Sequence, residues 1–268
     1  MLKVIVIGAA GRMGRRLVTC INNADDLQLA GALEYNESPF LGQDAGIVAG
    51  CGTADVEISS DLSALLGNAD AVIDFSTGDV VENAKKATSA GSAIVIGTTA
   101  LGEKEKSELN ALVEKGGRIV LAPNMSIGVN LLFHLSKQVA NILGDSYNIE
   151  IIEMHHNKKK DAPSGTAVRL AECVAEGRNL SYTKNAVHGR EGIVGERGKD
   201  EIGMHAVRGG DVVGDHTVIF AAEGERVELT HKASSRDTFA LGALKAVRFL
   251  SNAEPGFYDM QDVLGLKG

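Results

Sequence analysis

The sequence contains no tryptophan and few other aromatic residues, with four tyrosines and seven phenylalanines among 268 residues. Proteins that bind single-stranded nucleic acid stack the bases on aromatic side chains, and this composition offers little for such stacking. The formal net charge of -8 also opposes broad affinity for nucleic acid. The sequence therefore predicts that the chain binds no nucleic acid and that any anion it binds is small.

Cysteine is also scarce, and the three cysteines are Cys20, Cys51 and Cys173. Their number is odd, they lie far apart and no Cys-x-x-Cys pair occurs, so neither a disulfide framework nor a zinc site is indicated. We expect buried structural thiols and no bound metal.

Long hydrophobic runs are missing, although 44% of the residues are hydrophobic. No window approaches the run of about 20 apolar residues that a membrane span needs. The residues before the apolar stretch Val4–Ile7 are too few for a signal peptide. The sequence therefore predicts a cytoplasmic protein without a membrane segment, long enough for two domains.

A glycine-rich turn follows the first apolar run. Lys3–Ile7 predicts a strand, Gly8–Gly14 (GAAGRMG) a turn and Arg15–Ile21 a helix. Such a turn lets the backbone pass close to a pyrophosphate, while the N–H groups of the helix start face the phosphates. The spacing is G-x-x-G-x-x-G, with Ala9 where the usual fingerprint has a glycine. The pattern alone is therefore only moderately specific.

The next strand strengthens this interpretation. Gln28–Leu33 predicts a strand that ends at Glu34, about 20 positions beyond Gly14. An acidic residue at that spacing accepts a hydrogen bond from a ribose hydroxyl in dinucleotide-binding folds. The two features together favour a dinucleotide site over a plain tight turn.

Strand and helix patterns then alternate through the first half of the chain, after Tyr35–Asp55, which we interpret as a loop. Further strands are predicted at Val56–Ile58, Ala71–Phe75, Ala93–Ile96 and Ile119–Ala122. Helices are predicted at Ser60–Leu66, Asp79–Ala90, Glu103–Glu114 and Ile127–Leu143. This alternation predicts an α/β fold with a Rossmann-like, doubly wound parallel sheet.

Ligands of such sheets bind at the carboxyl ends of the strands. The polar and glycine residues expected along that edge are Ser76, Thr77, Gly97, Thr98, Thr99 and Asn124. Since threonine and asparagine also cap helices, a purely structural role is an equal alternative for each of them.

The second half has a different character. Its predicted strands are Asn148–Met154, Ile202–Arg208, Asp215–Ala222 and Arg226–Lys232. They lie close together with Gly-containing turns, which predicts an α+β domain with a mixed or antiparallel sheet. The glycine-rich, charged stretch 176–201 is longer than most connections, so it is either a mobile functional loop or part of a subunit contact.

The domain boundaries follow from this change of pattern. We expect a dinucleotide-binding domain over residues 1–126, completed by the C-terminal segment 237–268, which begins with a predicted helix over Asp237–Leu250. Residues 127–236 form the expected domain for substrate binding and oligomerisation.

The densest group of functional side chains runs from Glu153 to Ala167 (EMHHNKKKDAPSGTA). It joins two imidazoles, three ammonium groups and a Pro-Ser-Gly-Thr turn that opens a predicted helix. The N-terminus of a helix attracts carboxylates and phosphates, and histidine exchanges protons near neutral pH. We interpret the segment as a site for an anion, with a solvated basic loop as the alternative.

These motifs resemble those of the 4-hydroxy-tetrahydrodipicolinate reductase family, also called dihydrodipicolinate reductases, over essentially the whole chain. The matching motifs are GAAGRMG (8–14), DFS (74–76), GTT (97–99), NMSIGVN (124–130), EMHHNKKKDAPSGTA (153–167), REG (190–192), VRGGD (207–211) and HKASSR (231–236). The resemblance implies an enzyme of the diaminopimelate route to lysine that reduces a cyclic unsaturated dicarboxylate with NADH or NADPH. It also implies a homotetramer formed through the second domain.

The resemblance also implies roles for individual residues. His155 corresponds to the catalytic acid/base and Lys159 to the proton donor, while His156, Gly165 and Thr166 correspond to substrate contacts. The implied cofactor contacts are Gly8, Ala9, Ala10, Gly11, Arg12, Met13, Glu34, Gly97, Thr98, Thr99, Ala122, Pro123, Asn124 and Met125.

One departure from the family concerns the cofactor. Several members carry an arginine directly after the acidic residue, where it can pair with the 2′-phosphate of NADPH, but here Tyr35 and Asn36 follow Glu34. A carboxylate repels a phosphate unless a cation intervenes. We therefore expect a preference for NADH, with NADPH as a possible second cofactor through Arg12 and nearby lysines.

Two other readings of the sequence remain open at this point. Aspartate and homoserine dehydrogenases also pair a Rossmann half with a second domain, but the His155-His156 cluster is not expected of them. A non-catalytic dinucleotide-binding sensor needs the glycine turn but has no need for His155 and Lys159 together.

Overall fold

The structure is a computed structural model that describes residues 1–98 and 101–267, so Thr99 lies outside the described residues. The chain forms two compact units. Unit 1 combines Met1–Ile127 with the chain from Arg236 onward, and unit 2 is Gly128–Ser235. None of the described helices is long and apolar enough to cross a bilayer.

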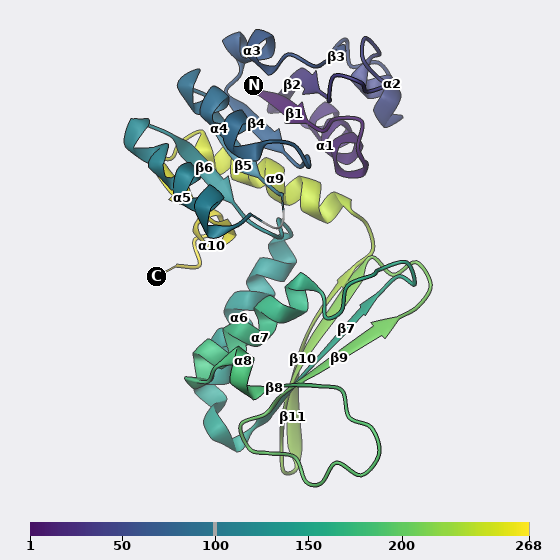
Figure 1. Ribbon diagram of the computed structural model, residues 1–268, viewed down its shortest axis with the longest axis vertical. Coiled ribbons are helices and arrows are strands. Elements are labelled where there is room, and N and C mark those ends of the chain that lie inside the picture. Colours follow the sequence, from purple (N-terminus) through teal and green to yellow (C-terminus); the bar gives the residue numbers. More distant parts are fainter. Residues whose placement is uncertain (99–100, 268) are drawn as a thin grey trace. The chain divides into compact units, whose positions relative to one another are not determined.

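Unit 1 contains a parallel sheet, which in the described part of the chain has seven strands in the order β12-β6-β5-β4-β1-β2-β3. The strands are β1 (Leu2–Ile7), β2 (Leu27–Leu33), β3 (Ile58–Ser59), β4 (Ala71–Asp74), β5 (Ala93–Ile96), β6 (Arg118–Leu121) and β12 (Gly256–Tyr258). The helices are α1 (Arg12–Asn22), α2 (Ala45–Ala49), α3 (Leu62–Leu65), α4 (Val80–Ser89), α5 (Glu103–Ala111), α9 (Asp237–Leu250) and α10 (Met260–Val263). This arrangement confirms the predicted doubly wound sheet (Figure 1).

The sheet has an apolar core on each face because side chains alternate along a strand. In β1, Val4 and Val6 join one core, to which α1 and α9 contribute, whereas Ile5 and Ile7 join the other, to which α3, α4 and α5 contribute. Strands that are buried on both faces read as continuous apolar runs, as parallel sheets require.

Unit 2 contains a mixed sheet in the order β11-β10-β7-β9-β8. The strands are β7 (Asn148–His155), β8 (Ala186–His188), β9 (Ile202–Arg208), β10 (Gly214–Ala222) and β11 (Glu225–Ala233). The helices of the second half are α6 (Ile127–Leu143), α7 (Gly165–Arg178) and α8 (Tyr182–Asn185). Strand β7 pairs parallel with β9 and antiparallel with β10, and α6 and α7 share the apolar core of the unit with the sheet.

Several short elements differ from the sequence prediction. Helix α2 lies in the predicted loop Tyr35–Asp55, where the Asp44 carboxylate accepts from the Ile47 amide and also from Ala54. Stretch 176–201 contains α8 and β8, and β8 adds an edge to the sheet by pairing with β9. Strand β12 follows α9 and pairs with β6. Elements of three to five residues carry too little periodicity to be found in a sequence.

The cysteines also differ in part from the expectation. Cys173 is buried, but Cys20 and Cys51 are only half-buried. Burial raises the pKa of the Cys173 thiol to about 11, which keeps it protonated and unreactive.

Candidate functional site

The turn after β1 has the backbone geometry that its glycines predict. Gly8 has a φ of +75°, which favours glycine. A Cβ on Gly14 would lie 2.0 Å from the Gly8 carbonyl oxygen, so only glycine lets α1 pack this closely on the turn. The Gly11 amide closes the turn by donating to the Gly8 oxygen over 3.0 Å.

The start of α1 is suited to an anion. Gly11 is the N-cap, and within the described residues no side chain caps this helix and no acidic residue lies in its first turn. Gly11 and Arg12 are exposed and Met13 is half-buried. Outward-facing N–H groups at such a helix start bind phosphate. The turn therefore fits the pyrophosphate of a dinucleotide.

Glu34 lies directly against this turn. It follows the end of β2, and its carboxylate accepts a hydrogen bond from the Ala10 amide over 2.8 Å. The amides of Gly8 and Ala9 both donate to the Leu33 carbonyl, which joins the glycine turn to the end of β2. The Glu34 carboxylate thus lies where it can accept a hydrogen bond from a ribose hydroxyl.

The ends of β4, β5 and β6 continue the same edge of the sheet. A Cβ on Gly97 would lie 2.3 Å from the Phe75 ring, so any larger residue there would have to displace that ring. The Thr98 hydroxyl donates to the Ser76 carbonyl over 2.9 Å, and a Cβ on Gly8 would touch Ser76 at 3.4 Å. The structure therefore brings residues after β1, β4 and β5 together.

The segment after β6 carries the remaining predicted cofactor contacts. The Ala122 amide donates to Ile96 over 3.2 Å, and Met125 is buried. The Asn124 side chain accepts from the Ser126 amide over 2.9 Å, while Pro123 is exposed. Asn124 thus has the turn-stabilising role that was the structural alternative, in addition to any role in binding.

In unit 2, His155 ends β7 beside a buried carboxylate. Its Nδ1 lies 2.6 Å from Glu153 Oε2, and the Glu153 side chain is only 1% exposed. Burial opposes ionisation of Glu153, but hydrogen bonds from Arg208 and His155 outweigh it, so the pKa of this carboxyl lies below its ordinary value. Glu153 is therefore ionised at neutral pH.

The three consecutive lysines have different surroundings. Lys158 and Lys160 are exposed, whereas the Lys159 side chain is 19% exposed and its ammonium group lies 2.8 Å from the Asp161 carboxylate. The ammonium group holds the pKa of Asp161 below its usual value. Among the three, Lys159 is the one that the fold holds in place.

The start of α7 follows this basic segment. Ser164 is the N-cap, and its hydroxyl accepts from the Ala167 amide over 3.1 Å. Gly165 and Thr166 are the first two residues of the helix, which has no acidic residue in its first turn. This positive end of the helix dipole favours a carboxylate. Nearby in sequence, His156 Nδ1 is buried and has no hydrogen-bond partner among the described residues.

The sequence interpretation assigned no role to Glu153, Arg208 or His216. Arg208, at the end of β9, donates two hydrogen bonds to Glu153, and His216 on β10 lies 3.0 Å from the Ser164 hydroxyl. The His155 and His216 rings meet edge to face. One signal was present in the sequence: Glu153 and His155 are two positions apart in a strand and so face the same side.

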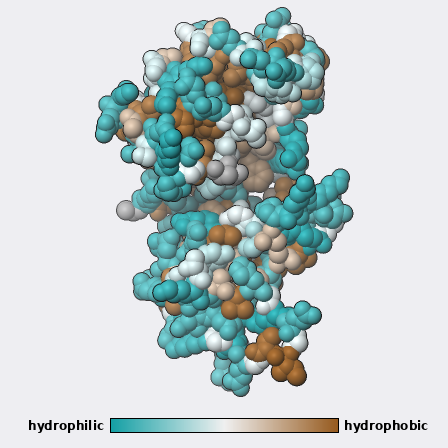
Figure 2. Space-filling model, viewed as in Figure 1, coloured by the Kyte–Doolittle hydropathy of each residue, from teal (hydrophilic) through white to brown (hydrophobic). Residues whose placement is uncertain are grey.

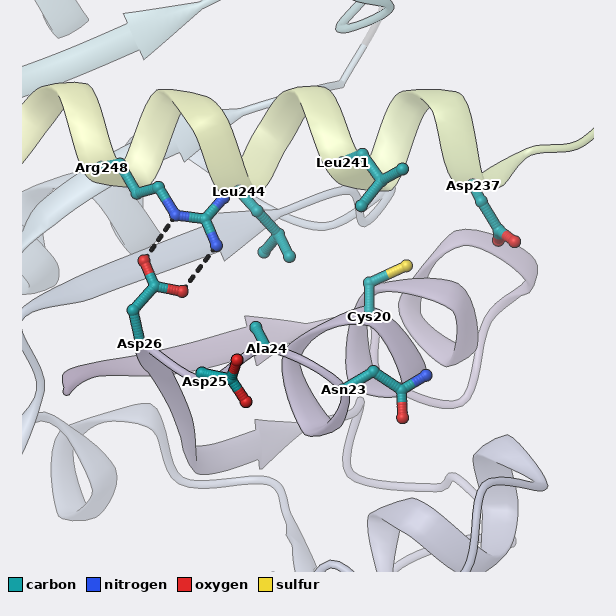
Figure 3. Close-up of a pocket in the computed structure, with 9 residues that line it drawn as sticks. All are labelled: Cys20, Asn23, Ala24, Asp25, Asp26, Asp237, Leu241, Leu244 and Arg248. Carbon is teal, nitrogen blue, oxygen red and sulfur yellow. Dashed lines mark hydrogen bonds and ion pairs between the residues drawn. The ribbon is translucent and has the colours of Figure 1, made fainter.

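Unit 1 has a hollow between α1 and α9 (Figure 3). Asp26 pairs with Arg248 there, and Asp237 pairs with Arg16. No predicted site residue lines this hollow. Across the described residues, no group of three or more His, Cys, Asp or Glu side chains is arranged to hold a metal ion.

Comparison with known families covers nearly the whole chain. The family model "Dihydrodipicolinate reductase, N-terminus" matches residues 2–125, and the model "Dihydrodipicolinate reductase, C-terminus" matches residues 128–264.

Individual proteins are also similar to this chain over its full length. The 4-hydroxy-tetrahydrodipicolinate reductases of Syntrophotalea carbinolica and Geotalea daltonii are 53% and 51% identical over 268 residues, covering 100% of this chain and of theirs. Among solved structures, the dipicolinate-bound dihydrodipicolinate reductase from Paenisporosarcina sp. TG-14 has the same fold, with a TM-score of 0.77 and 24% identity over 98% of each chain.

Proposed function

Since this chain belongs to the dihydrodipicolinate reductase family, we propose that His155 and Lys159 carry out its proton chemistry and that the turn Gly8–Met13 binds its cofactor. The protein is an oxidoreductase of the diaminopimelate route to lysine. Its family uses a nicotinamide dinucleotide. Full-length identity near 50% to named reductases does not favour an aspartate or homoserine dehydrogenase, or a sensor without turnover.

The cofactor site proposed in unit 1 consists of Gly8, Ala9, Ala10, Gly11, Arg12, Met13, Glu34, Gly97, Thr98, Thr99, Ala122, Pro123, Asn124 and Met125. Its support is the uncapped start of α1 and the contact of Glu34 with the glycine turn. When bound, the nicotinamide supplies a hydride. The Glu34 carboxylate beside this turn favours a ribose hydroxyl over a 2′-phosphate, so NADH is the preferred cofactor in this proposal.

The substrate site proposed in unit 2 takes a small dicarboxylate. The amides of Gly165 and Thr166 at the start of α7 bind one carboxylate, and His156 contributes a further contact. The neighbouring solved reductase has dipicolinate, a ring with two carboxylates, bound to it. A ligand of this chemistry fits a helix start that carries no acidic side chain in its first turn.

The proton step falls to the side chains next to that helix. Reduction of a conjugated cyclic acid leaves an electron-rich atom, and the Lys159 ammonium group protonates it, with His155 as the acid/base beside it. The pairing of Lys159 with Asp161 holds the ammonium group in place before substrate arrives.

One observation carries this proposal: Lys159 is half-buried and paired with Asp161, whereas Lys158 and Lys160 are exposed. We expect Lys159→Ala to lower kcat by about 10²- to 10⁴-fold, with little change in the Kd for NADH. The matched control is Lys158→Ala, which removes an exposed ammonium one position away and leaves kcat within about threefold. An equal loss of kcat in both variants would overturn the assignment.

We further propose that the chain works as a cytoplasmic homotetramer assembled through unit 2. Large apolar side chains are exposed there, including Ile193 and Val194 in the loop between β8 and β9. Figure 2 shows that the surface of unit 2 has apolar areas among the polar ones. Val207 and Ile152 on the sheet are also exposed. Sedimentation equilibrium gives the mass of four chains if this is right, whereas a monomer at micromolar concentration contradicts it.

A further inference from the structure

Glu153 is a charged residue in a place that normally excludes charge. Its side chain is 1% exposed, yet its carboxylate is ionised and receives hydrogen bonds from three directions. Arg208 donates to both oxygens over 2.7 and 2.9 Å, and the Ser164 amide donates to Oε1 over 3.1 Å. A buried carboxylate that lost these partners would be strongly destabilising, so the fold maintains this charge at one fixed position.

The remaining partner of this carboxylate is His155. A carboxylate only accepts hydrogen bonds, so the contact of 2.6 Å requires the proton to be on Nδ1 of His155. When the ring is neutral, its Nε2 then carries the lone pair. When the ring is protonated, the same carboxylate stabilises the imidazolium.

The surroundings of the ring support this orientation. His216 meets His155 edge to face, with 5.2 Å between the ring centroids. A Cβ on Gly214 would lie 3.0 Å from His155 Nε2, so the start of β10 passes directly beside that edge of the ring. Strand pairing places Glu153 opposite His216 on β10, and His216 opposite His231 on β11.

We propose that Glu153 is a positioning residue for the reaction: it fixes the Nδ1–H tautomer and the orientation of His155, while Arg208 and the Ser164 amide hold Glu153. This inference rests on the proposed role of His155. It assigns a function to a residue that touches neither substrate nor cofactor in the proposed mechanism.

The chain contains a matched control for this residue. Glu150 lies on the same strand and faces the opposite side, with His205 Nε2 2.6 Å from its Oε2. Arg190 and Arg197 donate to it over 3.0 and 2.9 Å. Glu150 thus has the same kind of partners as Glu153, but it does not contact His155.

The experiment compares Glu153→Gln, Glu153→Asp and Glu150→Gln in steady-state turnover with NADH. We expect Glu153→Gln to lower kcat by about a hundredfold or more, with KM and the Kd for NADH changed less than about threefold. Glu153→Asp keeps the charge, so we expect its kcat to be at least about tenfold higher than that of Glu153→Gln. Glu150→Gln leaves kcat within about threefold, even where its Tm falls. Equal effects of Glu150→Gln and Glu153→Gln on kcat would overturn the proposal.

A second measurement needs no variant of Glu153. In protein labelled with ¹⁵N-histidine, the His155 signals are assigned by their absence in His155→Asn. The proposal predicts the Nδ1–H tautomer for the neutral ring, and the Nε2–H tautomer would overturn it. If His155→Asn itself retains full kcat, the proposed function fails; if only Glu153→Gln retains it, this inference alone fails.

Discussion

The two units build their candidate sites from different materials. In unit 1 the site is mainly backbone: the Gly8 turn, the uncapped start of α1 and the close approach at Gly97. In unit 2 it is a network of charged side chains around Glu153. A backbone site depends on the absence of side-chain atoms, whereas a side-chain network depends on exact partners. We therefore expect substitutions in unit 1 to act through collisions with the backbone and substitutions in unit 2 to act through the loss of partners.

The largest effect expected in this comparison comes from Gly14→Ala. The new Cβ would meet the Gly8 carbonyl oxygen at 2.0 Å, so the turn must shift. We expect a loss of about 3 kcal/mol in unfolding free energy together with weaker NADH binding, measured by urea unfolding and fluorescence titration. Gly67→Ala is the control, because nothing lies within 4 Å of its Cβ position. Unchanged stability of Gly14→Ala would contradict a tightly packed turn.

A smaller effect should arise from His216 in the network of unit 2. The pKa of His216 is lowered to about 3, mainly by burial and secondly by the neighbouring His155. In the unfolded chain this pKa is about 6.5. Between these values the unfolded state binds a proton that the folded state does not. Stability is therefore complete above pH 6.5 and falls as the pH falls, by up to about 1.4 kcal/mol per unit from this residue.

Unfolding free energies at pH 7, 6 and 5 test this expectation. His216→Asn removes the titrating ring, so the variant loses less stability than the unmodified chain on going from pH 7 to pH 5. The same loss in both proteins would show that His216 is not held neutral by the network. Gly14→Ala serves as a comparison, because it adds and removes no titrating group and keeps the original pH dependence.

The smallest effect expected concerns cofactor choice in unit 1. Tyr35 follows Glu34 and is 61% exposed, so it can be replaced without disturbing the core. Tyr35→Arg places a cation beside the position expected for a 2′-phosphate, and we predict a rise of about tenfold in kcat/KM with NADPH. Tyr35→Gln is the uncharged control. A preference for NADPH in the unmodified chain would contradict the proposed role of Glu34.

The sequence predicted the backbone site better than the side-chain network, for a physical reason. Gly8 and Gly14 occupy positions where another residue would be strained or would collide, so the requirement is visible in the sequence itself. Apart from His155 on the same strand, the partners of Glu153 come from β9 and from the start of α7, and only the tertiary fold brings these to Glu153. The run of three lysines in the sequence could not show which of the ammonium groups the fold would keep in a fixed position.

The same reason explains the differences in the fold. The long periodic elements were predicted because their apolar faces repeat over many residues. Helix α2 instead depends on the Asp44 carboxylate, which accepts from amides up to 12 positions away. Strands β8 and β12 exist because a neighbouring strand offers an edge with which they pair.

A crystal structure with NADH and pyridine-2,6-dicarboxylate bound would show directly whether His155 and Lys159 meet the substrate. We expect one carboxylate on the Gly165 and Thr166 amides and the ring within hydrogen-bonding reach of Lys159, with His155 beside it. A dicarboxylate bound away from both His155 and Lys159 would contradict the account.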